Sequence, residues 1–313
     1  MRAVLRTYGV QLALIGVAAI WGGTFVTVKD AVARYPFLYA FLTLRFAIAV
    51  MAFALVVPSA VRLMSRRTLG VGVLAGLFLT GGYVFQTWGL QGTSASKAAF
   101  ITGMFVVMTP VMQAALLRRP PARMTVSGIV LAVAGLWLLS GGDAGGWNAG
   151  DTRVLLCAVA YSAHMIVLGG PGRDHDVRPL TLVQLATVAV VCGAIAFATE
   201  RPLTLPTGLP VWGALLLTGV LASAVAFAVQ TYAQRFLSPT KTALILITEP
   251  AFGGVFGWIA GERLGIGGLA GSALILAGMI VAEVAGGREA EAGEASFEPA
   301  LEGPPVPMSD DLT

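Results

Sequence analysis

The chain has 313 residues, of which 57% are hydrophobic and only 12% are charged. Soluble domains carry roughly a quarter charged residues, so this composition excludes a water-soluble protein with a single buried core. The formal net charge of +4 needs no nucleic-acid partner, because basic loops beside anionic lipid explain it. The two cysteines fall within apolar stretches and imply no disulfide framework.

Apolar stretches of about 18 to 22 residues follow one another along the chain, and a helix needs roughly 20 apolar residues to cross a bilayer core of about 30 Å. The alternating polarity of a β-barrel is absent. We therefore predict an all-α membrane protein with ten transmembrane helices. In chain order the expected spans lie at about residues 10–29, 37–57, 69–91, 97–117, 124–141, 154–169, 179–198, 210–230, 239–260 and 266–284.

The basic residues predict the orientation. With the amino terminus inside the cell, thirteen of the 20 Lys and Arg residues fall on the cytoplasmic side, six fall outside, and Arg45 lies within the second span. Positive residues favour the cytoplasmic side, so we expect a multi-pass protein of the inner (plasma) membrane with both termini cytoplasmic. The first span is too long for a cleaved signal peptide.

The chain contains an internal repeat. FQTWGLQGTSASKAAFI at 85–101 aligns without a gap to VQTYAQRFLSPTKTALI at 229–245, with six of the 17 positions identical. Shorter matches pair AIW at 19–21 with VAY at 159–161, and Pro110 with Pro250, at offsets between 140 and 144. Each copy holds five spans, an odd number, so the second copy crosses the membrane in the opposite sense. We predict two inverted five-helix repeats, 1–145 and 146–285, with a substrate path between them near the midplane.

The first two spans carry three candidates, namely Trp21, Thr24 and Arg45. Trp21 and Thr24 are weaker candidates for a cavity lining. His164 in the sixth span is a further weak candidate, although a lone histidine in a span is usually a packing residue. Arg45 lies too deep in the second span for easy snorkelling. It is expected to bond backbone carbonyls or a partner such as Glu249, and contact with a substrate is the alternative.

The third and eighth spans carry matched polar and aromatic residues. Gln86 lies one helical turn from Tyr83, and Gln230 lies one helical turn from Phe227. Trp88 and Tyr232, close by in the same two spans, are weaker candidates of the same kind. Uncharged polar groups beside aromatic walls suit a site for small organic solutes. Hydrogen bonding between helices is an equally good explanation of the two glutamines.

Two lysines and a glutamate are the remaining candidates. Lys97 and Lys241 open the fourth and ninth spans from opposite faces, where they either snorkel to head groups or line the mouths of the pathway and engage a carboxylate. Glu249 lies in a long uncharged run, where a carboxylate costs at least roughly 2.5 kcal/mol to insert. It either hydrogen-bonds a neighbouring helix or has a functional role, in which it exchanges a proton or meets a substrate amine. Thr109 precedes the matching proline of the first repeat, so only the second repeat offers this acid.

Three segments together resemble a known family: AIWGGTFVTVK in the first span, TSASKAAFITGMFVVMTP in the fourth and TEPAFGGVFGWIAGERL in the ninth. They are similar to the drug/metabolite transporter superfamily, and within it to the EamA-like ten-helix bacterial permeases. The resemblance covers residues 10 to about 285. It implies two five-helix repeats, alternating access and, often, efflux of amino acids or related metabolites. One departure is Ala122-Arg123 where the second repeat has Glu262-Arg263.

Enzyme motifs are absent from the sequence. It has no Walker A loop, no H-E-x-x-H and no G-x-S-x-G, so we expect no enzyme, no cofactor and no metal site. Residues 286–313 are acidic and rich in Gly and Pro, which predicts a disordered cytoplasmic tail. The partners expected are a small-molecule substrate and the lipid bilayer, and glycine-lined helix faces would permit a homodimer.

The sequence thus favours a secondary transporter that moves a small organic metabolite, an amino acid or an amphipathic compound, across the inner membrane, with export as the leading direction. The alternative is a membrane sensor or assembly factor with a ligand pocket and no transport.

Overall fold

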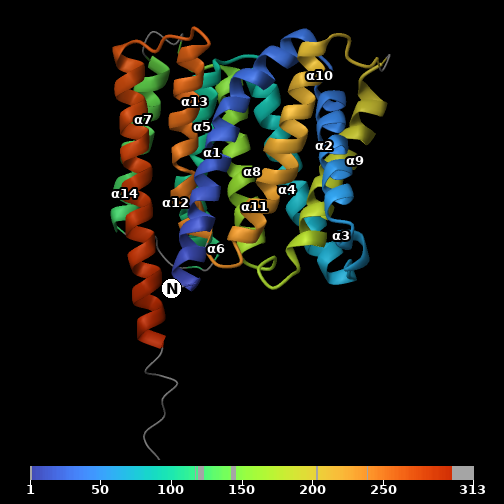
Figure 1. Cartoon of the computed structure of the whole chain (residues 1–313). Coiled ribbons are helices and arrows are strands. Elements are labelled where there is room, and N and C mark those ends of the chain that lie inside the picture. The colour runs from blue at the N-terminus through green and yellow to red at the C-terminus, as the bar shows by residue number, and fades with distance from the viewer. Residues whose placement is uncertain are drawn as a thin grey trace, which may run out of the picture.

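The computed structural model describes residues 2–116, 118, 123–141, 146–201, 204–237 and 239–297, all of them in helices or their connections. The all-α prediction is confirmed (Figure 1). The helices are α1 (Arg2–Arg34), α2 (Leu38–Val56), α3 (Ser59–Arg62), α4 (Arg66–Leu90), α5 (Ala95–Gly103), α6 (Phe105–Leu116), α7 (Arg123–Gly141), α8 (Ala149–Gly169), α9 (Val177–Thr199), α10 (Leu209–Leu216), the π-helix η1 (Leu217–Val225), α11 (Ala226–Ala233), α12 (Pro239–Leu246), α13 (Thr248–Ile259) and α14 (Ile266–Phe297).

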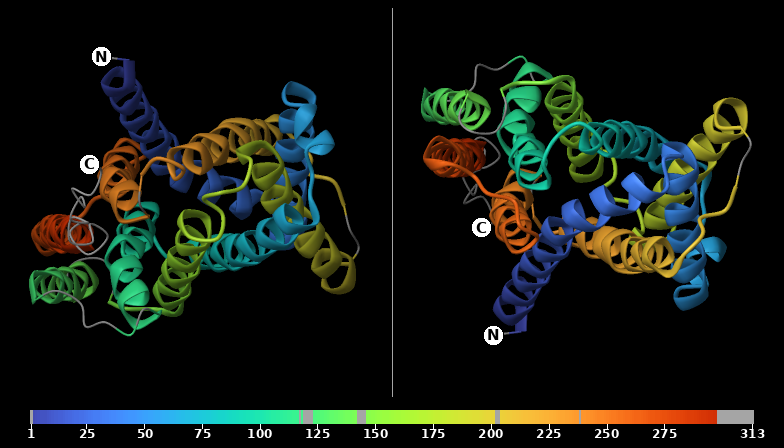
Figure 2. Two further views of the ribbon diagram at one scale, coloured as in Figure 1. Left: turned by 90° about the horizontal axis from the view of Figure 1, so that it is seen from below. Right: turned by 90° about the horizontal axis from the view of Figure 1, so that it is seen from above.

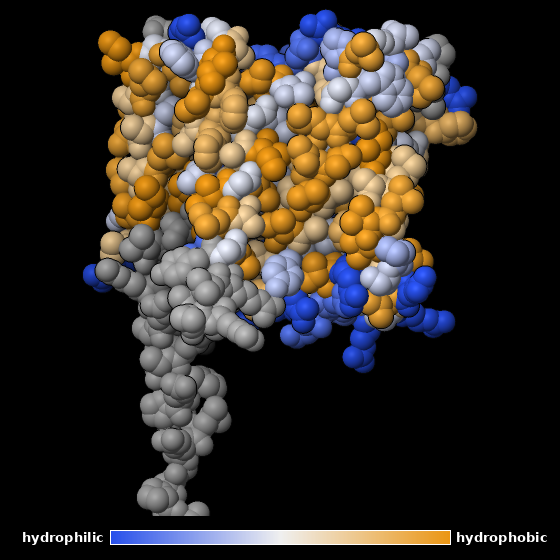
Figure 3. Space-filling model, viewed as in Figure 1, coloured by the Kyte–Doolittle hydropathy of each residue, from blue (hydrophilic) through white to orange (hydrophobic). Residues whose placement is uncertain are grey.

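These elements form ten helical passes, as the sequence predicts. Seven passes in the described residues are long and apolar enough to cross a membrane, and α7 and α14 each contain a shorter apolar helix. The ninth pass is divided between α12 and α13. Figure 3 shows the apolar side chains gathered in a broad band, with hydrophilic residues concentrated at the two ends of the bundle. The band is the surface that faces lipid.

Three passes depart from regular α-helix. The fourth is broken at Met104, between α5 and α6, and the ninth at Ile247, between α12 and α13. These breaks lie at corresponding places in the two repeats. Pro110 lies inside α6 rather than at its break. The eighth pass contains the π-helix η1, and such segments are frequent at functional sites.

The structure corrects two of the expected boundaries. The sixth pass begins at Ala149 rather than near 154, because Asn148 and Asp151 form a reciprocal capping box that starts the helix in a polar stretch. The last helix continues to Phe297 rather than ending near 284. Its extension is rich in Ala and Glu, which are good helix formers, so the first part of the expected disordered tail is helical. The rest of that tail, 298–313, lies outside the described residues.

Helix packing follows the inverted repeat. Helices at equivalent positions in the two halves pack on each other, namely α2 with α9, α5 with α13, and α7 with α14. Other contacts are related by the repeat. The packing of α4 on α8 has its equivalent in the packing of α11 on α1. Both views in Figure 2 show α7 and α14 together at one edge of the bundle and α2 and α9 toward the other. The two-fold arrangement predicted from the repeat is therefore present.

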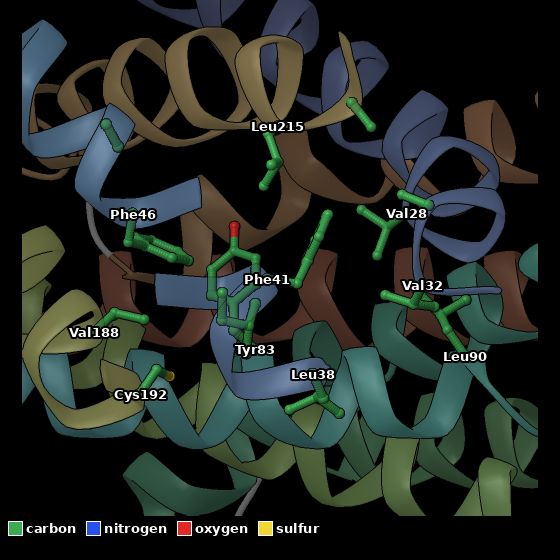
Figure 4. Close-up of a cluster of buried hydrophobic side chains, with 14 of the residues drawn as sticks. Val28, Val32, Leu38, Phe41, Phe46, Tyr83, Leu90, Val188, Cys192 and Leu215 are labelled. Carbon is green, nitrogen blue, oxygen red and sulfur yellow. The ribbon is translucent and has the colours of Figure 1, made fainter. Parts of the chain in front are cut away.

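The largest buried apolar cluster surrounds α2. Phe41 and Phe46 are fully buried, and the ring of Phe46 meets that of Tyr83 edge-on at 4.8 Å between centroids. Figure 4 shows these side chains converging with Leu215 from α10. The cluster fixes α2 against α4 and the eighth pass, and so positions the polar groups that lie beside it.

The glycine faces that suggested a homodimer pack within the chain. A Cβ on Gly271 of α14 would lie 2.5 Å from the backbone nitrogen of Leu139 in α7, and one on Gly253 would lie 2.3 Å from the Cβ of Ala99. Helix backbones approach this closely only where one residue lacks a side chain. Gly261 has φ 95° and ends α13 as a left-handed residue, so it serves the turn rather than the packing face.

Candidate functional site

A central cavity lies between the two halves, and the space within its walls measures about 470 Å³, part of it open to solvent. Its walls come from the first, third and fourth passes of the first half and from the matching passes of the second half. The described residues that line it are Trp21, Thr24, Phe25, Tyr83, Gln86, Phe105, Tyr161, His164, Met165, Phe227, Gln230, Leu246 and Glu249.

Twelve of these thirteen lining residues form six pairs related by the repeat. At an offset of 140, Trp21 pairs with Tyr161, and Thr24 and Phe25 pair with the next two lining residues of α8. At an offset of 144, Tyr83, Gln86 and Phe105 pair with Phe227, Gln230 and Glu249. The cavity is therefore centred on the pseudo-two-fold axis. The partner of Glu249 in the first half is Phe105, and Thr109, which the proline match suggested, bonds back to the Phe105 carbonyl instead.

An aromatic row crosses the cavity. The ring centroids of Trp21 and Phe227 are 5.3 Å apart, those of Phe227 and Tyr83 are 6.1 Å apart, and those of Tyr83 and Tyr161 are 5.7 Å apart. Trp21 Nε1 also donates to the Ala222 carbonyl of the π-helix at 2.8 Å. Trp21 and Tyr83 thus line the central cavity, and their expected contact with a substrate stays a prediction. Tyr161 was missed, although its repeat match to Trp21 was the signal that could have found it.

The two glutamines line the cavity but are bonded differently. Gln86 Nε2 donates to Thr102 Oγ1 at 3.4 Å, and its Oε1 accepts from the hydroxyl of Tyr161 at 3.4 Å. Gln230 Nε2 donates to Gln234 Oε1 at 3.4 Å, while its own Oε1 is buried without a hydrogen-bond partner in the described structure. Both explanations drawn from the sequence hold for Gln86, which lines the cavity and bonds other helices.

Glu249 lines the cavity from the first turn of α13, directly after the break at Ile247. Only 4% of the residue is exposed, and no described residue forms a hydrogen bond or ion pair with its carboxyl group. Pro250, behind it, packs close to Gly103 of α5. The expectation that Glu249 serves as a hydrogen-bonding link to a neighbouring helix is not met by this structure, because the carboxyl faces the cavity instead.

Arg45 does not contact Glu249 or backbone carbonyls. It is 2% exposed, its Nε donates to Ser223 Oγ at 3.1 Å, and its Nη2 donates to the Tyr83 hydroxyl at 3.2 Å. Its guanidinium lies 4.5 Å from the centroid of the Tyr83 ring. Arg45 therefore stands behind the cavity wall and acts on the cavity through Tyr83.

Trp88 and Tyr232 are not among the cavity residues. Two residues further along an α-helix turn the side chain about 200° around the axis, so a helix that presents Gln86 or Gln230 to the cavity turns these rings away. Trp88 is 41% exposed and stacks on the guanidinium of Arg153 at 4.0 Å. Tyr232 packs against Phe236.

Lys97 neither snorkels to head groups nor lines the cavity. It is 1% exposed, and its Nζ donates to Asp151 Oδ2 at 2.7 Å and to the Gly146 carbonyl at 2.6 Å. Asp151 also accepts from the Thr93 hydroxyl at 2.6 Å. The sequence reading missed Asp151, and the Asn-x-x-Asp capping pattern before the sixth span was its signal. The side chain of Lys241 lies outside the described residues, so its expected role stays a prediction.

Two further carboxylates, those of Glu262 and Glu200, connect helices at the same end of the bundle as Asp151. This end carries the connections after α1, α4, α7, α9 and α13 and lies at the top of Figure 1; we call it the upper end and the opposite one the lower end. Glu262 Oε1 and Oε2 accept from the backbone N–H groups of Ala95 and Ser96, each at 2.8 Å, at the start of α5. Lys29 Nζ also donates to Glu262 Oε1 at 3.2 Å.

Glu200 repeats this arrangement at the start of α2. Its two carboxylate oxygens accept from the N–H groups of Tyr39 and Ala40 at 2.9 and 2.8 Å. A carboxylate that accepts the free N–H groups of a helix terminus is stabilised by the helix dipole as well. Although burial alone raises the pKa of the Glu262 carboxyl, the hydrogen bonds from Ser96 and Ala95 outweigh it and leave that pKa below its ordinary value.

The described residues contain no group of three or more His, Cys, Asp or Glu side chains that could hold a metal ion. Cys157 and Cys192 are free and buried. His164 lines the cavity and shares its Nε2 with Gln184 Oε1 at 2.7 Å, so this weaker candidate is both a cavity residue and a packing residue.

Known proteins resemble this chain along most of its length. The sequence model of the EamA-like transporter family matches it twice, over residues 8–141 and 148–283. A relative from Archaeoglobus fulgidus, named as an uncharacterized transporter, is 32% identical over 254 residues, which cover 81% of this chain and 78% of that protein. A solved structure titled only "Crystal structure of protein" shares the fold with a TM-score of 0.68 at 18% identity, over 90% of this chain and 98% of the other.

The two family matches coincide with the two five-helix halves, and the break between them falls at the connection from α7 to α8. The cavity that these halves enclose lies at the repeat interface, which is where transporters built from inverted repeats hold their substrates. The chain is therefore a multi-pass membrane protein that belongs to the EamA-like transporter family of the drug/metabolite transporter superfamily.

Proposed function

We propose that this protein is a secondary transporter that moves a small organic metabolite across the inner membrane by alternating access, in the direction of export. The observation that carries the proposal is the central cavity, whose lining comes in pairs from the two halves. A cavity on a pseudo-two-fold axis can be exposed to either side by the same rocking movement of one half against the other.

The contacts at the upper end support a conformation closed on that side. Glu200, Glu262 and Asp151 belong to the second half, and each bonds to residues of the first half. At the lower end, the hydrogen bonds between the described residues of the two halves are weaker in kind: the Thr68 hydroxyl meets His175 Nδ1 at 3.0 Å, and Arg178 donates to Ser59 at 3.4 Å. Opening the upper end requires the carboxylate bonds to break.

Under the positive-inside rule, the basic loops favour a cytoplasmic position for the lower end. A cavity that is closed on the outer side loads from the cytoplasm, which is the order of events that export requires. Glu249 is the group proposed to couple this movement to protons, because it is the buried carboxyl that faces the cavity without a protein partner in the described structure.

Spin-label distances at both ends test alternating access without a known substrate. In a variant lacking the natural cysteines, one pair of labels replaces Ala33 and Leu209 at the upper end, and another replaces Met64 and Arg173 at the lower end; all four residues are exposed. We expect two populations at each end, with upper-end separation accompanying lower-end closure when pH or lipid composition is changed. A single unchanging distance at both ends would instead favour a membrane sensor with a fixed ligand pocket.

A further inference from the structure

We propose that the cavity binds organic cations, namely protonated primary or secondary amines with an aromatic or apolar body, in preference to zwitterionic amino acids and carboxylates. This inference rests on the proposed function and specifies its substrate class. It is carried by two unpartnered hydrogen-bond acceptors in the cavity wall and by the aromatic rings around them.

Glu249 is the first acceptor. Glu249 is 4% exposed and lines the cavity, and its carboxyl has no hydrogen bond or ion pair within the described structure. An isolated buried carboxylate is costly, and a cation that approaches it supplies the missing partner. The matching position in the first half is Phe105, so the carboxyl lies on one wall only.

Gln230 Oε1 is the second acceptor, and its orientation is fixed by a chain of amides. Gln234 Nε2 must donate to the Met165 carbonyl, at 3.1 Å, because a carbonyl can only accept. Gln234 Oε1 therefore faces Gln230 and accepts from its Nε2 at 3.4 Å. This leaves Gln230 Oε1 buried and unbonded. An N–H donor on the ligand would satisfy it.

The equivalent amide in the first half is already occupied. Gln86 bonds Thr102 through its nitrogen and Tyr161 through its oxygen. The unfilled hydrogen-bonding capacity thus lies in the second half, where Gln230 and Glu249 both face the cavity. Both groups accept, so a ligand that fits them donates. An ammonium group donates in up to three directions and carries the complementary charge.

No permanently charged cation lines the cavity among the described residues. Arg45 is the buried cation beside it, but its guanidinium stands behind Tyr83 and bonds the hydroxyl of that residue. A carboxylate ligand could reach Arg45 only by displacing Tyr83. The other ionisable lining group is His164, whose Nε2 is shared with Gln184.

The remaining wall suits the body of such a ligand. Six aromatic residues line the cavity, and their rings offer apolar area and faces that attract a cation. These six are Trp21, Phe25, Tyr83, Phe105, Tyr161 and Phe227. An amine with one aromatic ring would place its charged end at Glu249 and its ring among these side chains.

Three compounds with the same phenyl-ethyl body and different charge test the proposal. We would titrate the detergent-purified full-length protein with phenethylamine, phenylalanine and 3-phenylpropionate by calorimetry, with the thermal unfolding midpoint as a second readout. We expect phenethylamine to bind at least tenfold more tightly than the other two. Tighter binding of phenylalanine or 3-phenylpropionate, or equal binding of all three, would overturn the proposal.

Variants then locate the effect. Glu249→Gln should remove most of the preference for phenethylamine over neutral 2-phenylethanol, whereas Asp30→Asn, which changes an exposed acid at the end of α1, should leave that preference intact. Gln230→Leu should weaken phenethylamine binding more than Gln86→Leu does. It should affect benzyltrimethylammonium less, since that cation has no N–H group to donate. Equal losses from both glutamine variants would contradict the role given to Gln230 Oε1.

Flux through proteoliposomes separates this inference from the proposed function. Selective binding of phenethylamine without any flux would refute transport and leave the binding site as inferred. Flux that favours phenylalanine over phenethylamine would refute the inference and leave transport intact.

Discussion

The upper and lower ends of the bundle are equivalent by repeat but different in chemistry. At the upper end, Glu262, Glu200 and Asp151 connect the two halves. The sequence positions that match them at the lower end hold no acid. Ala122 matches Glu262, Val57 follows α2 as Glu200 follows α9, and Gln11 matches Asp151 at an offset of 140.

This difference shows that the side chains, rather than the repeated backbone, determine which end of the bundle has stabilising contacts between the halves. Two copies of one backbone, threaded in opposite senses, would close equally well at either end. Carboxylates that bond free helix N–H groups and a buried lysine stabilise closure at one end only. Under the alternating access proposed above, the acids of the second half favour the conformation with the upper end closed, and removing them one at a time should weaken that preference by different amounts.

The largest effect is expected for Lys97→Met. Lys97 and Asp151 form an ion pair whose side chains are 2% and 0% exposed, so removing one partner leaves an uncompensated buried charge. Breaking such a pair typically costs about 3–5 kcal/mol. We expect a large fall in the thermal unfolding midpoint of the detergent-purified protein.

The double variant Lys97→Met with Asp151→Leu is the control, since it removes both charges together. It should recover much of the lost stability, because a buried ion pair replaced by apolar groups is often tolerated. A double variant no more stable than Lys97→Met would mean that the Asp151 cap of α8, rather than the ion pair, provides the stability.

Glu262→Ala should have the next largest effect, on closure rather than on folding. The variant loses two hydrogen bonds from α5 to a charged acceptor, each worth about 1.5–3 kcal/mol when the acceptor is ionised. Spin labels at the upper end should then show a larger open population. Glu262→Gln keeps one acceptor oxygen and should lie between the wild type and Glu262→Ala.

The same contact predicts a pH dependence of closure. The bonds to Ser96 and Ala95 lower the pKa of Glu262 in the closed conformation below its ordinary value of 4.5. Protonation therefore favours the open conformation. The stabilising contribution is complete above pH 4.5 and is lost as pH falls through the lowered pKa. Upper-end distances measured from pH 7 down to pH 3 should lengthen in the wild type, and the change should be smaller in Glu262→Ala.

The fold was predictable because its signals are strong and local. Apolar spans and a gapless match at 85–101 and 229–245 specify ten helices and an inverted repeat without any tertiary information. The same match, carried forward without a gap, aligns Phe105 with Glu249. The match of Pro110 to Pro250 predicts Thr109 instead, because it uses an offset of 140 in place of 144, and Thr109 lies about one turn beyond Phe105 in α6.

The contacts at the upper end were much harder to predict. The Glu200 and Glu262 bonds join residues more than 150 positions apart, and their acceptors meet backbone N–H groups that no side-chain pattern reveals. The sequence left Lys97 either at the head groups or on a carboxylate at a mouth of the pathway. Asp151 was not identified as that carboxylate because it lies before the expected start of the sixth span. The orientation of Arg45 toward Ser223 depends on helix packing at the π-helix and has no signature in the sequence.

The acids that connect the halves at the upper end all belong to the second half. Glu249→Gln tests whether the acid that the second half contributes to the cavity also has a role of its own. In proteoliposomes loaded with phenethylamine, a pH gradient should accelerate flux through the wild type, and the variant should lose about tenfold, or ~1.4 kcal/mol, of that acceleration. Exchange of phenethylamine without a gradient should persist at concentrations that offset its weaker binding to the variant, because exchange requires no net proton movement. An unchanged response to the gradient would assign proton coupling, if present, to another group.

The smallest effect is expected for Lys29→Met, which separates the two kinds of contact that Glu262 makes. The Lys29 and Glu262 side chains are 40% and 20% exposed, and such a pair contributes about 0–1 kcal/mol in the presence of salt. The bonds from Ala95 and Ser96 remain in this variant, so upper-end closure should change little. Any change should disappear at roughly 0.5 M salt, because salt screens the interaction between exposed charges. If Lys29→Met opened the upper end as far as Glu262→Ala does, the ion pair rather than the helix N–H groups would hold the two halves together there.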